Sequence, residues 1–180
     1  MEQVNNYSAG RPILGFAEAV KICFRKYFDF TGRARRSEYW WFSLFISIVS
    51  AVCSFLDGLL SVAVNYEIVG TVATVLLFFP ALAVGFRRLH DIGRSGWWLG
   101  ATYILAAISV ICVLFMTGFD FSLLMKQNHD QLYQVLTGSQ KLIALLPLIA
   151  GLVLCVIVFF FKLQDSHSEE NKYGPSPKYQ

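Results

Sequence analysis

The chain has 180 residues, of which 56% are hydrophobic, 16% aromatic and 15% charged, and its formal net charge is +3. Soluble domains carry about 25% charged residues, so this composition excludes an ordinary soluble protein, and we expect no nucleic-acid partner. None of the four cysteines has CxxC spacing, and we expect neither a disulfide nor a metal site from them.

The chain begins with a polar segment, residues 1–13, which we expect to be a flexible cytoplasmic tail. A short amphipathic helix is predicted over about 14–28. A basic helix of this kind, just ahead of a membrane span, tends to lie flat on the inner leaflet. It is equally compatible with packing over the end of a helical bundle. The two faces of this helix differ, with Phe16, Val20, Cys23, Phe24 and Tyr27 on one and Glu18, Lys21 and Arg25 on the other.

Four apolar stretches of 19 to 23 residues dominate the rest of the chain. A hydrocarbon core of about 30 Å needs roughly 20 helical residues to cross it, so each stretch is long enough to span a membrane. The fold class expected is therefore an all-α membrane protein, forming a single membrane domain over residues 1–180 with a flexible cytoplasmic tail at 166–180. The four transmembrane helices are predicted at about 41–63, 68–86, 97–117 and 142–161.

The distribution of basic residues predicts the orientation of these spans. Thirteen of the fifteen Lys and Arg residues fall on one side of a four-span arrangement, and only Lys126 and Lys141 fall on the other. Basic residues close to span ends stay in the cytoplasm. Both termini are therefore predicted to be cytoplasmic (N-in, C-in).

Three residues interrupt the apolar stretches. Asp57 is the only charged residue inside any of them. An intramembrane carboxylate is a candidate functional group, but Asp57 is close to the outer end of its span, and we favour a role without special function. Pro80 and Pro147 break the helical hydrogen-bond pattern of the second and fourth spans. Such breaks would suit a small oligomeric transporter or channel.

Three polar segments border the spans: FTGRARRSEYWW at residues 30–41, RRLHDIGRSGWW at 87–98, and QDS at 164–166 followed by NKYGPSP at 171–177. Together, and in this order around the spans, they closely resemble a bacterial inner-membrane family known as domain of unknown function 805. The resemblance covers about residues 20–178. It implies a small multi-pass protein of the bacterial cytoplasmic membrane, and it implies no particular activity.

The arginines of these segments are candidate contacts for anionic lipid headgroups or for a protein partner. Arginine forms paired hydrogen bonds with phosphate, although charge bias alone also explains arginine at this position. Neighbouring glycines at 32, 93 and 96 suggest tight turns or the close approach of a ligand or another chain. The six candidates are Arg33, Arg35, Arg36, Arg87, Arg88 and Arg94.

A second set of residues is predicted to form a structural cap over the same end of the protein. Carboxylates in the set would pair with the arginines, and its tryptophans are typical of the aromatic belt at headgroup level. The set comprises Glu38, His90, Asp91, Trp97, Trp98 and Tyr173. A metal site formed by His90, Asp91, His167 and Asp165 is a weaker alternative.

The leading hypothesis from the sequence is a non-enzymatic membrane scaffold or partner subunit whose basic cytoplasmic end binds anionic lipid headgroups or another protein. We expect membrane lipids as partners, together with a second copy of the chain or another membrane protein, and no cofactor. One alternative is a small oligomeric transporter or channel. A second is a lipid-modifying enzyme that uses His90 and Asp91, with His90 as general base.

Overall fold

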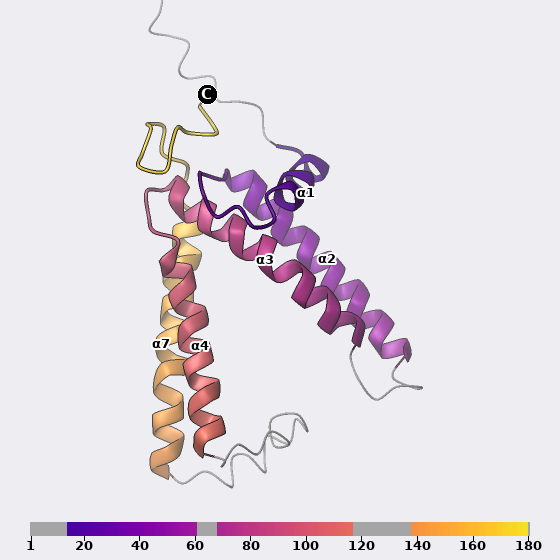
Figure 1. Cartoon of the computed structure of the whole chain (residues 1–180), viewed down its shortest axis with the longest axis vertical. Helices are drawn as coiled ribbons and strands as arrows, with labels where there is room; N and C mark the ends of the chain where they lie inside the picture. Colours follow the sequence, from indigo (N-terminus) through magenta and orange to yellow (C-terminus); the bar gives the residue numbers. More distant parts are fainter. Residues whose placement is uncertain (1–13, 61–67, 117–137, 180) are drawn as a thin grey trace, which may run out of the picture. The chain divides into compact units, whose positions relative to one another are not determined.

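The computed structural model describes residues 14–60, 68–116 and 138–179 (Figure 1). These residues form helices joined by turns, together with one isolated antiparallel bridge between Asn171 and Gly174. The all-α fold class predicted from the sequence is thereby confirmed. The helices are α1 (Phe16–Arg25), α2 (Arg36–Leu60), α3 (Ile68–Asp91), α4 (Trp97–Met116) and α7 (Gly138–Leu163).

Within the described residues, α2, α3, α4 and α7 are long and apolar enough to cross a membrane, which confirms the four predicted spans. The ends of three helices differ from the prediction. α2 begins at Arg36 rather than near residue 41, α3 continues to Asp91 rather than ending near residue 86, and α7 begins at Gly138 rather than near residue 142. Charged side chains do not mark the exit into water here, because Glu38 in the first turn of α2 and Asp91 at the end of α3 are buried against arginines of the protein.

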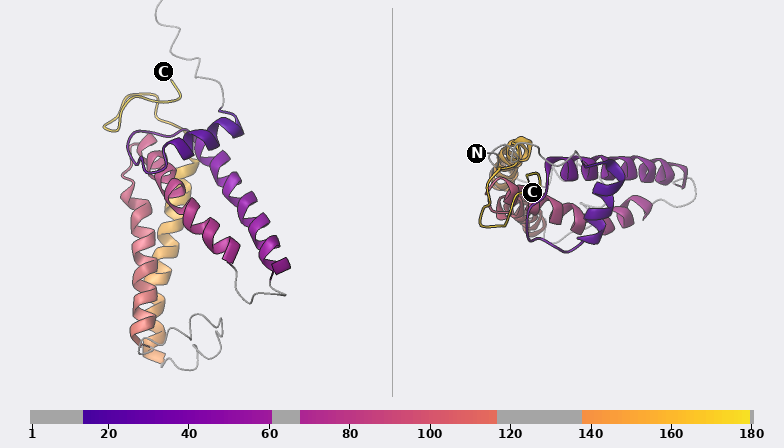
Figure 2. Two further views of the ribbon diagram at one scale, coloured as in Figure 1. Left: turned by 45° about the vertical axis from the view of Figure 1, so that its right-hand side comes forward. Right: turned by 90° about the horizontal axis from the view of Figure 1, so that it is seen from above.

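The chain divides into two compact units, the first formed by Met1–Gly96 with Phe161–Gln180 and the second by Trp97–Phe160. In the first unit, α2 and α3 run side by side and α1 lies across both of them (Figures 1 and 2). A single domain over residues 1–180 stays a prediction. Residues 1–13, predicted to be a flexible tail, lie outside the described residues.

The core of the first unit lies where α1 meets α2 and α3. Cys23 of α1, Phe42 of α2 and Val84 of α3 are fully buried there. Phe24 adds an edge-to-face contact with Phe42, with ring centroids 5.8 Å apart. Contacts of this geometry add about 0.5–1.5 kcal/mol to the burial of the rings. α1 is thus packed on the two spans, and its placement on the membrane surface stays a prediction.

Pro80 interrupts the hydrogen bonding of α3, and α1 compensates for the interruption. Proline has no backbone N–H, so it cannot donate to the carbonyl of Leu76 four residues earlier. The hydroxyl of Tyr27, in the turn after α1, donates to that carbonyl instead. An acceptor that would otherwise face an apolar surrounding is thereby satisfied.

Tyr27→Phe is therefore expected to lower the free energy of unfolding by about 1 kcal/mol, the net value of a typical hydrogen bond. In a Pro80→Ala background the loss should shrink, because the restored N–H donates to the Leu76 carbonyl. Thermal unfolding of the two single variants and the double variant in detergent micelles measures this coupling. An equal loss from Tyr27→Phe in both backgrounds would contradict the assignment.

Asp57, the charged residue of the first span, stabilises the start of α3. Its two carboxylate oxygens accept hydrogen bonds from the backbone N–H groups of Val69 and Gly70, at 3.0 and 2.7 Å. The first N–H groups of a helix have no partner inside the helix, and a negative charge is favoured beside them. A side chain at position 70 would place its Cβ 3.0 Å from an Asp57 oxygen, which explains the glycine. Asp57 thus has a structural role in linking the two spans.

The second unit contains α4 and the part of α7 that ends at Phe160. The two helices lie side by side (Figures 1 and 2), and a Cβ added to Gly151 would be 3.6 Å from the Cβ of Leu105. Large apolar side chains such as Ile111, Phe115 and Leu152 remain exposed on this pair. Acyl chains are as apolar as these side chains, so exposing the side chains to lipid carries no free-energy penalty.

Candidate functional site

The polar segments singled out in the sequence meet at one end of the first unit. The last turn of α3 positions them. Gly93 adopts φ +73°, and its N–H donates to the His90 carbonyl at 3.0 Å while the Arg94 N–H donates to the Leu89 carbonyl at 2.9 Å. These two bonds form a Schellman motif, which ends a helix through a left-handed residue, usually glycine. Gly93 therefore terminates α3 directly after Asp91.

Asp91 is the centre of the site. Its side chain is fully buried, and its two oxygens lie 2.9 Å from Arg33 Nε and 2.6 Å from Arg88 Nη1. The hydroxyl of Ser166 donates a further hydrogen bond to the same carboxylate. One carboxylate thus connects the segment before α2, the end of α3 and the segment after α7.

A second buried ion pair lies beside the first. Arg87 Nη2 is 2.8 Å from Glu38 Oε1, and both side chains are buried. The thiol of Cys23 approaches the same Glu38 oxygen at 3.9 Å. Burial, followed by the charge of Glu38, raises the pKa of the Cys23 thiol to about 12, so the thiol stays protonated at neutral pH. We call Arg33, Glu38, Arg87, Arg88 and Asp91 the arginine cluster.

The arginine cluster holds three buried arginines against two buried carboxylates, and carbonyl groups at helix ends supply the missing negative charge. Arg87 donates to the carbonyl of Lys26, which caps α1, at 3.2 Å. Arg33 donates to the carbonyl of Asp91 at the end of α3, at 3.1 Å. Arg88 donates to the carbonyl of Lys162 at the end of α7, at 3.3 Å. The C-terminus of a helix carries about half a negative charge, so each cation stabilises a different helix end.

Arg33 uses all its hydrogen-bonding capacity inside the protein. A guanidinium has five N–H donors. Besides its two bonds to Asp91, Arg33 donates to the main-chain carbonyls of His167, Glu169 and Gly174, at 2.6, 2.8 and 3.1 Å. No donor of Arg33 is left for a phosphate unless one of these partners is displaced.

The C-terminal segment, residues 164–178, is attached to this end of the protein mainly through its main chain. Arg88 donates to the carbonyl of Gln164, and Arg35 to that of Pro177 at 2.6 Å. In the opposite direction, the Asn171 side chain donates to the His90 carbonyl at 3.0 Å. Residues 166–179 therefore lie against the ends of α2 and α3. The predicted flexibility of this tail stays a prediction.

His90, the candidate general base, contacts the carbonyl of Gly32 and the ring of Tyr173. Its Nδ1 lies 3.2 Å from the Gly32 carbonyl, and its ring stacks on Tyr173 with centroids 3.8 Å apart and planes 6° apart. Gly32 itself adopts φ +73°, a conformation that only glycine reaches without strain. Among the described residues, no three His, Cys, Asp or Glu side chains gather closely enough to hold a metal ion.

The remaining candidates differ in their exposure. Arg36, the first residue of α2, and Arg94, after α3, are exposed, and the Arg94 guanidinium lies 5.0 Å from the centre of the Phe161 ring. Arg35 is half-buried. Trp97 and Trp98 begin α4 in the second unit, with 68% and 39% of their surface exposed. The structure thus brings the predicted residues Arg33, Arg35, Glu38, Arg87, Arg88, His90, Asp91 and Tyr173 into direct contacts within one unit.

An exposed ion pair fastens the end of the C-terminal segment. Lys178 Nζ lies 2.6 Å from Asp165 Oδ2. This hydrogen bond holds the pKa of the Asp165 carboxyl below its ordinary 3.8 and the pKa of Lys178 above its ordinary 10.5. Since the folded pKa of Asp165 is the lower one, its contribution to stability is present above pH 3.8 and is lost as the pH falls further. The contribution of Lys178 is lost at the alkaline end, as the pH rises through its raised pKa.

Asp165→Asn is therefore expected to lower the melting temperature slightly at pH 7, because an exposed ion pair contributes little. The difference from the wild type should disappear as the pH falls below the carboxyl's pKa. Thermal unfolding of both proteins in detergent micelles over a pH series from 7 to below 3 tests this. A difference that grows in acid would be incompatible with a lowered pKa for Asp165.

Several contributors to the site are absent from the sequence prediction. Ser166 and Asn171 belong to quoted motifs, yet no spacing rule assigns them to Asp91 and His90. Cys23 carries no signal beyond its place on the apolar face of α1. The main-chain carbonyls that accept hydrogen bonds from Arg33 cannot be identified from the sequence, because every residue has a carbonyl.

Comparison with known proteins identifies the family of the chain. Residues 27–175 match the family described as protein of unknown function, DUF805. Inner membrane protein YhaH of Escherichia coli (strain K12) is 31% identical over 160 residues, which cover 86% of this chain and 91% of the relative. Inner membrane protein YhaI of the same strain is 40% identical over 74 residues, covering 41% of this chain and 61% of the relative. No solved structure matches the chain.

Proposed function

This chain belongs to the DUF805 family of multi-pass inner-membrane proteins, and from that premise we propose that it is a non-enzymatic membrane component whose basic end lies in the cytoplasm and binds anionic lipid headgroups. In this role it acts as a small scaffold or partner subunit. The arginine cluster holds the segments at this end of the protein together, and the exposed arginines beside it bind the lipid headgroups.

The observation that carries the proposal is that the arginines at this end of the protein differ in exposure. Arg33, Arg87 and Arg88 are at most 7% exposed and are bonded to internal carboxylates and carbonyls. Arg36 and Arg94 are exposed, and each follows a buried member of the cluster by three positions in the chain. A basic residue beside an anionic leaflet contributes about 1 kcal/mol of binding. Arg36 and Arg94 are therefore the headgroup contacts of the proposal.

The cytoplasmic location of this end rests on the bias of thirteen basic residues against two. Reporter enzymes fused at Gln127 and at Gln180 test it in cells. The proposal expects a fusion at Gln180 to be active in the cytoplasm and a fusion at Gln127 to be active outside it. The reverse pattern would place the basic end away from the cytoplasmic leaflet and would overturn the proposal.

Lipid binding is tested with Arg36→Gln/Arg94→Gln in nanodiscs that contain phosphatidylethanolamine and labelled phosphatidylglycerol. Enrichment of the anionic lipid around the protein is read by energy transfer from the tryptophans. Each substitution should weaken the anionic-lipid affinity about fivefold, the equivalent of about 1 kcal/mol. The matched control is Lys126→Gln/Lys141→Gln, which removes the same charge from the opposite side of the membrane in the proposed orientation.

Unchanged enrichment in the arginine variant, or an equal loss in the control, would overturn lipid binding by these residues. Loss of a co-purifying membrane protein without any change in lipid enrichment would also overturn it, because the exposed arginines would then serve a protein contact. Melting temperatures of both variants close to that of the wild type would show that the comparison concerns folded protein.

A further inference from the structure

The C-terminal segment covers the two terminal nitrogens of the Arg33 guanidinium. Nη1 donates to the carbonyls of Glu169 and Gly174, at 2.8 and 3.1 Å, and Nη2 donates to the carbonyl of His167 at 2.6 Å. The two bonds to Asp91 use Nε and the other N–H of Nη2. Displacing the segment therefore frees N–H groups on both terminal nitrogens while Asp91 stays bound. Two nitrogens of one guanidinium form paired hydrogen bonds with a phosphate.

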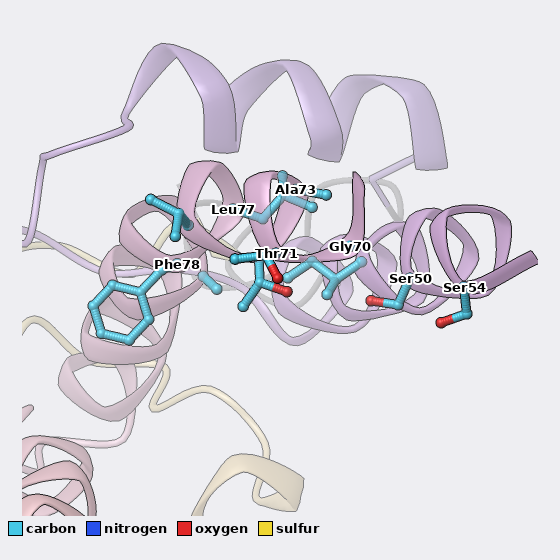
Figure 3. Close-up of a pocket in the computed structure, with 11 residues that line it drawn as sticks. Ser50, Ser54, Gly70, Thr71, Ala73, Leu77 and Phe78 are labelled. Atoms are coloured by element: carbon cyan, nitrogen blue, oxygen red, sulfur yellow. The ribbon is translucent and has the colours of Figure 1, made fainter. Parts of the chain in front are cut away.

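The groups that the segment offers to these arginines are neutral. The arginine cluster holds three arginines against two carboxylates, and Arg35, which donates to the carbonyl of Pro177 at 2.6 Å, adds a further cation. Main-chain carbonyls supply only dipoles against this excess of positive charge, whereas a phosphate supplies a net negative charge. By contrast, the pocket between α2 and α3 shown in Figure 3 has no charged side chain among its lining residues. The covered arginines are therefore the place in the first unit that suits an anion.

The segment buries little apolar surface, so it can open without movement of the helices. Among residues 164–179 the buried side chains belong to Ser166 and Ser176, and apolar burial is the main stabilising contribution in folding. The Ser176 hydroxyl is buried without a hydrogen-bond partner in the described part of the chain, a cost that ends when the segment opens and water reaches it. Chain ends with few buried apolar contacts are the parts of a protein that open locally.

We propose that the C-terminal segment is a displaceable cover over a phosphate-binding site formed by Arg33 and Arg35. In the closed state carbonyls of the segment accept the hydrogen bonds of these arginines, and in the open state a phosphate group accepts them and keeps the segment displaced. The phosphate belongs to a lipid headgroup or to a small soluble phosphate compound. This site is separate from the exposed contacts Arg36 and Arg94, and it does not rest on the proposed function.

Thiol labelling of Ser176→Cys measures the opening. The substitution replaces a buried hydroxyl that makes no hydrogen bond in the described part of the chain, and a hydrophilic maleimide reaches the thiol only when the segment opens. In detergent micelles free of phospholipid, inorganic phosphate should raise the labelling rate severalfold, and chloride at the same ionic strength should not. Mass spectrometry of the C-terminal peptide separates this thiol from the native cysteines. Ser168→Cys, exposed in the same segment, is the matched control, and its rate should not respond to phosphate.

A second variant relates the opening to the binding. Asn171→Ala removes the hydrogen bond to the His90 carbonyl. In the Ser176→Cys background it should raise the labelling rate about fivefold, the equivalent of one net hydrogen bond. The phosphate concentration that gives half of the full response should fall by the same factor, because both quantities depend on the open fraction. A labelling rate that does not respond to any phosphate compound, or two clearly unequal factors, would overturn the proposal.

The source of the phosphate is identified by adding phosphatidylglycerol to the same micelles. A response to this lipid but not to inorganic phosphate identifies a headgroup as the ligand, and the reverse identifies a soluble compound. Arg36→Gln/Arg94→Gln should keep the response, because the covered site does not use those residues. Loss of the response in that variant would assign the phosphate to the exposed arginines and overturn the cover. The nanodisc measurement of lipid enrichment is independent of this labelling, so failure of one proposal is distinguishable from failure of the other.

Discussion

Asp91→Asn is expected to destabilise the folded protein by about 3–5 kcal/mol, the cost of removing one partner from a buried ion pair. Asp91 is the shared counter-charge of Arg33 and Arg88, so its neutralisation leaves two buried cations without a carboxylate. A loss of this size is a large fraction of the stability of a typical domain. Thermal unfolding in detergent micelles, together with the amount of protein that accumulates in the membrane, measures it.

Asp165→Asn is the matched control for this experiment. It removes the same charge from a carboxylate that pairs with a single basic residue, Lys178, and the Asp165 side chain is 56% exposed. Surface substitutions of this kind usually change stability by no more than about 0.5 kcal/mol. Equal melting temperatures for Asp91→Asn and the wild type would mean that Arg33 and Arg88 need no counter-charge, and the arginine cluster would lose its structural role.

Truncation after Gln164 is expected to have the second large effect. It removes the carbonyls of His167, Glu169 and Gly174, which accept hydrogen bonds from three of the five N–H donors of Arg33. At about 1 kcal/mol for each net hydrogen bond, the loss amounts to about 3 kcal/mol. The measurement is again thermal unfolding, combined with the rate of proteolysis in the segment between α1 and α2.

A shorter truncation that removes only Tyr179 and Gln180 serves as the control, because none of the hydrogen bonds described above uses those residues. It should melt like the full chain. If both truncations melt at the same temperature, the C-terminal segment does not stabilise Arg33. A synthetic peptide of residues 165–178 that restores the melting temperature of the long truncation would identify the segment itself as the stabilising element.

Hydropathy was sufficient to find the spans and insufficient to find their ends. A run of apolar residues of membrane length reports a helix directly, which is why α4 and α7 lie where the composition places them. Charged residues are interpreted as the end of a span, so Arg36 and Asp91 fell outside the predicted helices. The side chains of Glu38, in the first turn of α2, and of Asp91 are held by arginines 49 and 58 positions away, and hydropathy contains no information about those partners.

The same limit applies to the site. The sequence indicated that carboxylates would pair with arginines, but not which ones. Asp91 selects Arg33, from 58 positions away, because the Schellman turn at Gly93 and the φ of Gly32 fix where the two segments meet. Whether an arginine faces water or a carbonyl depends on packing, so Arg33 and Arg36 look alike in sequence and differ completely in exposure.

The reliance of Arg33 on the last residues of the chain has a consequence for biosynthesis. Gly174 follows Arg33 by 141 positions, so at about 5–20 residues per second the ribosome needs roughly 7–28 s to deliver it. Until then the guanidinium has Asp91 as its partner, while three of its N–H donors lack the carbonyls that accept them in the folded protein. A nascent chain halted before Gly174 would therefore insert with an incompletely bonded guanidinium, which distinguishes unfinished copies from finished ones.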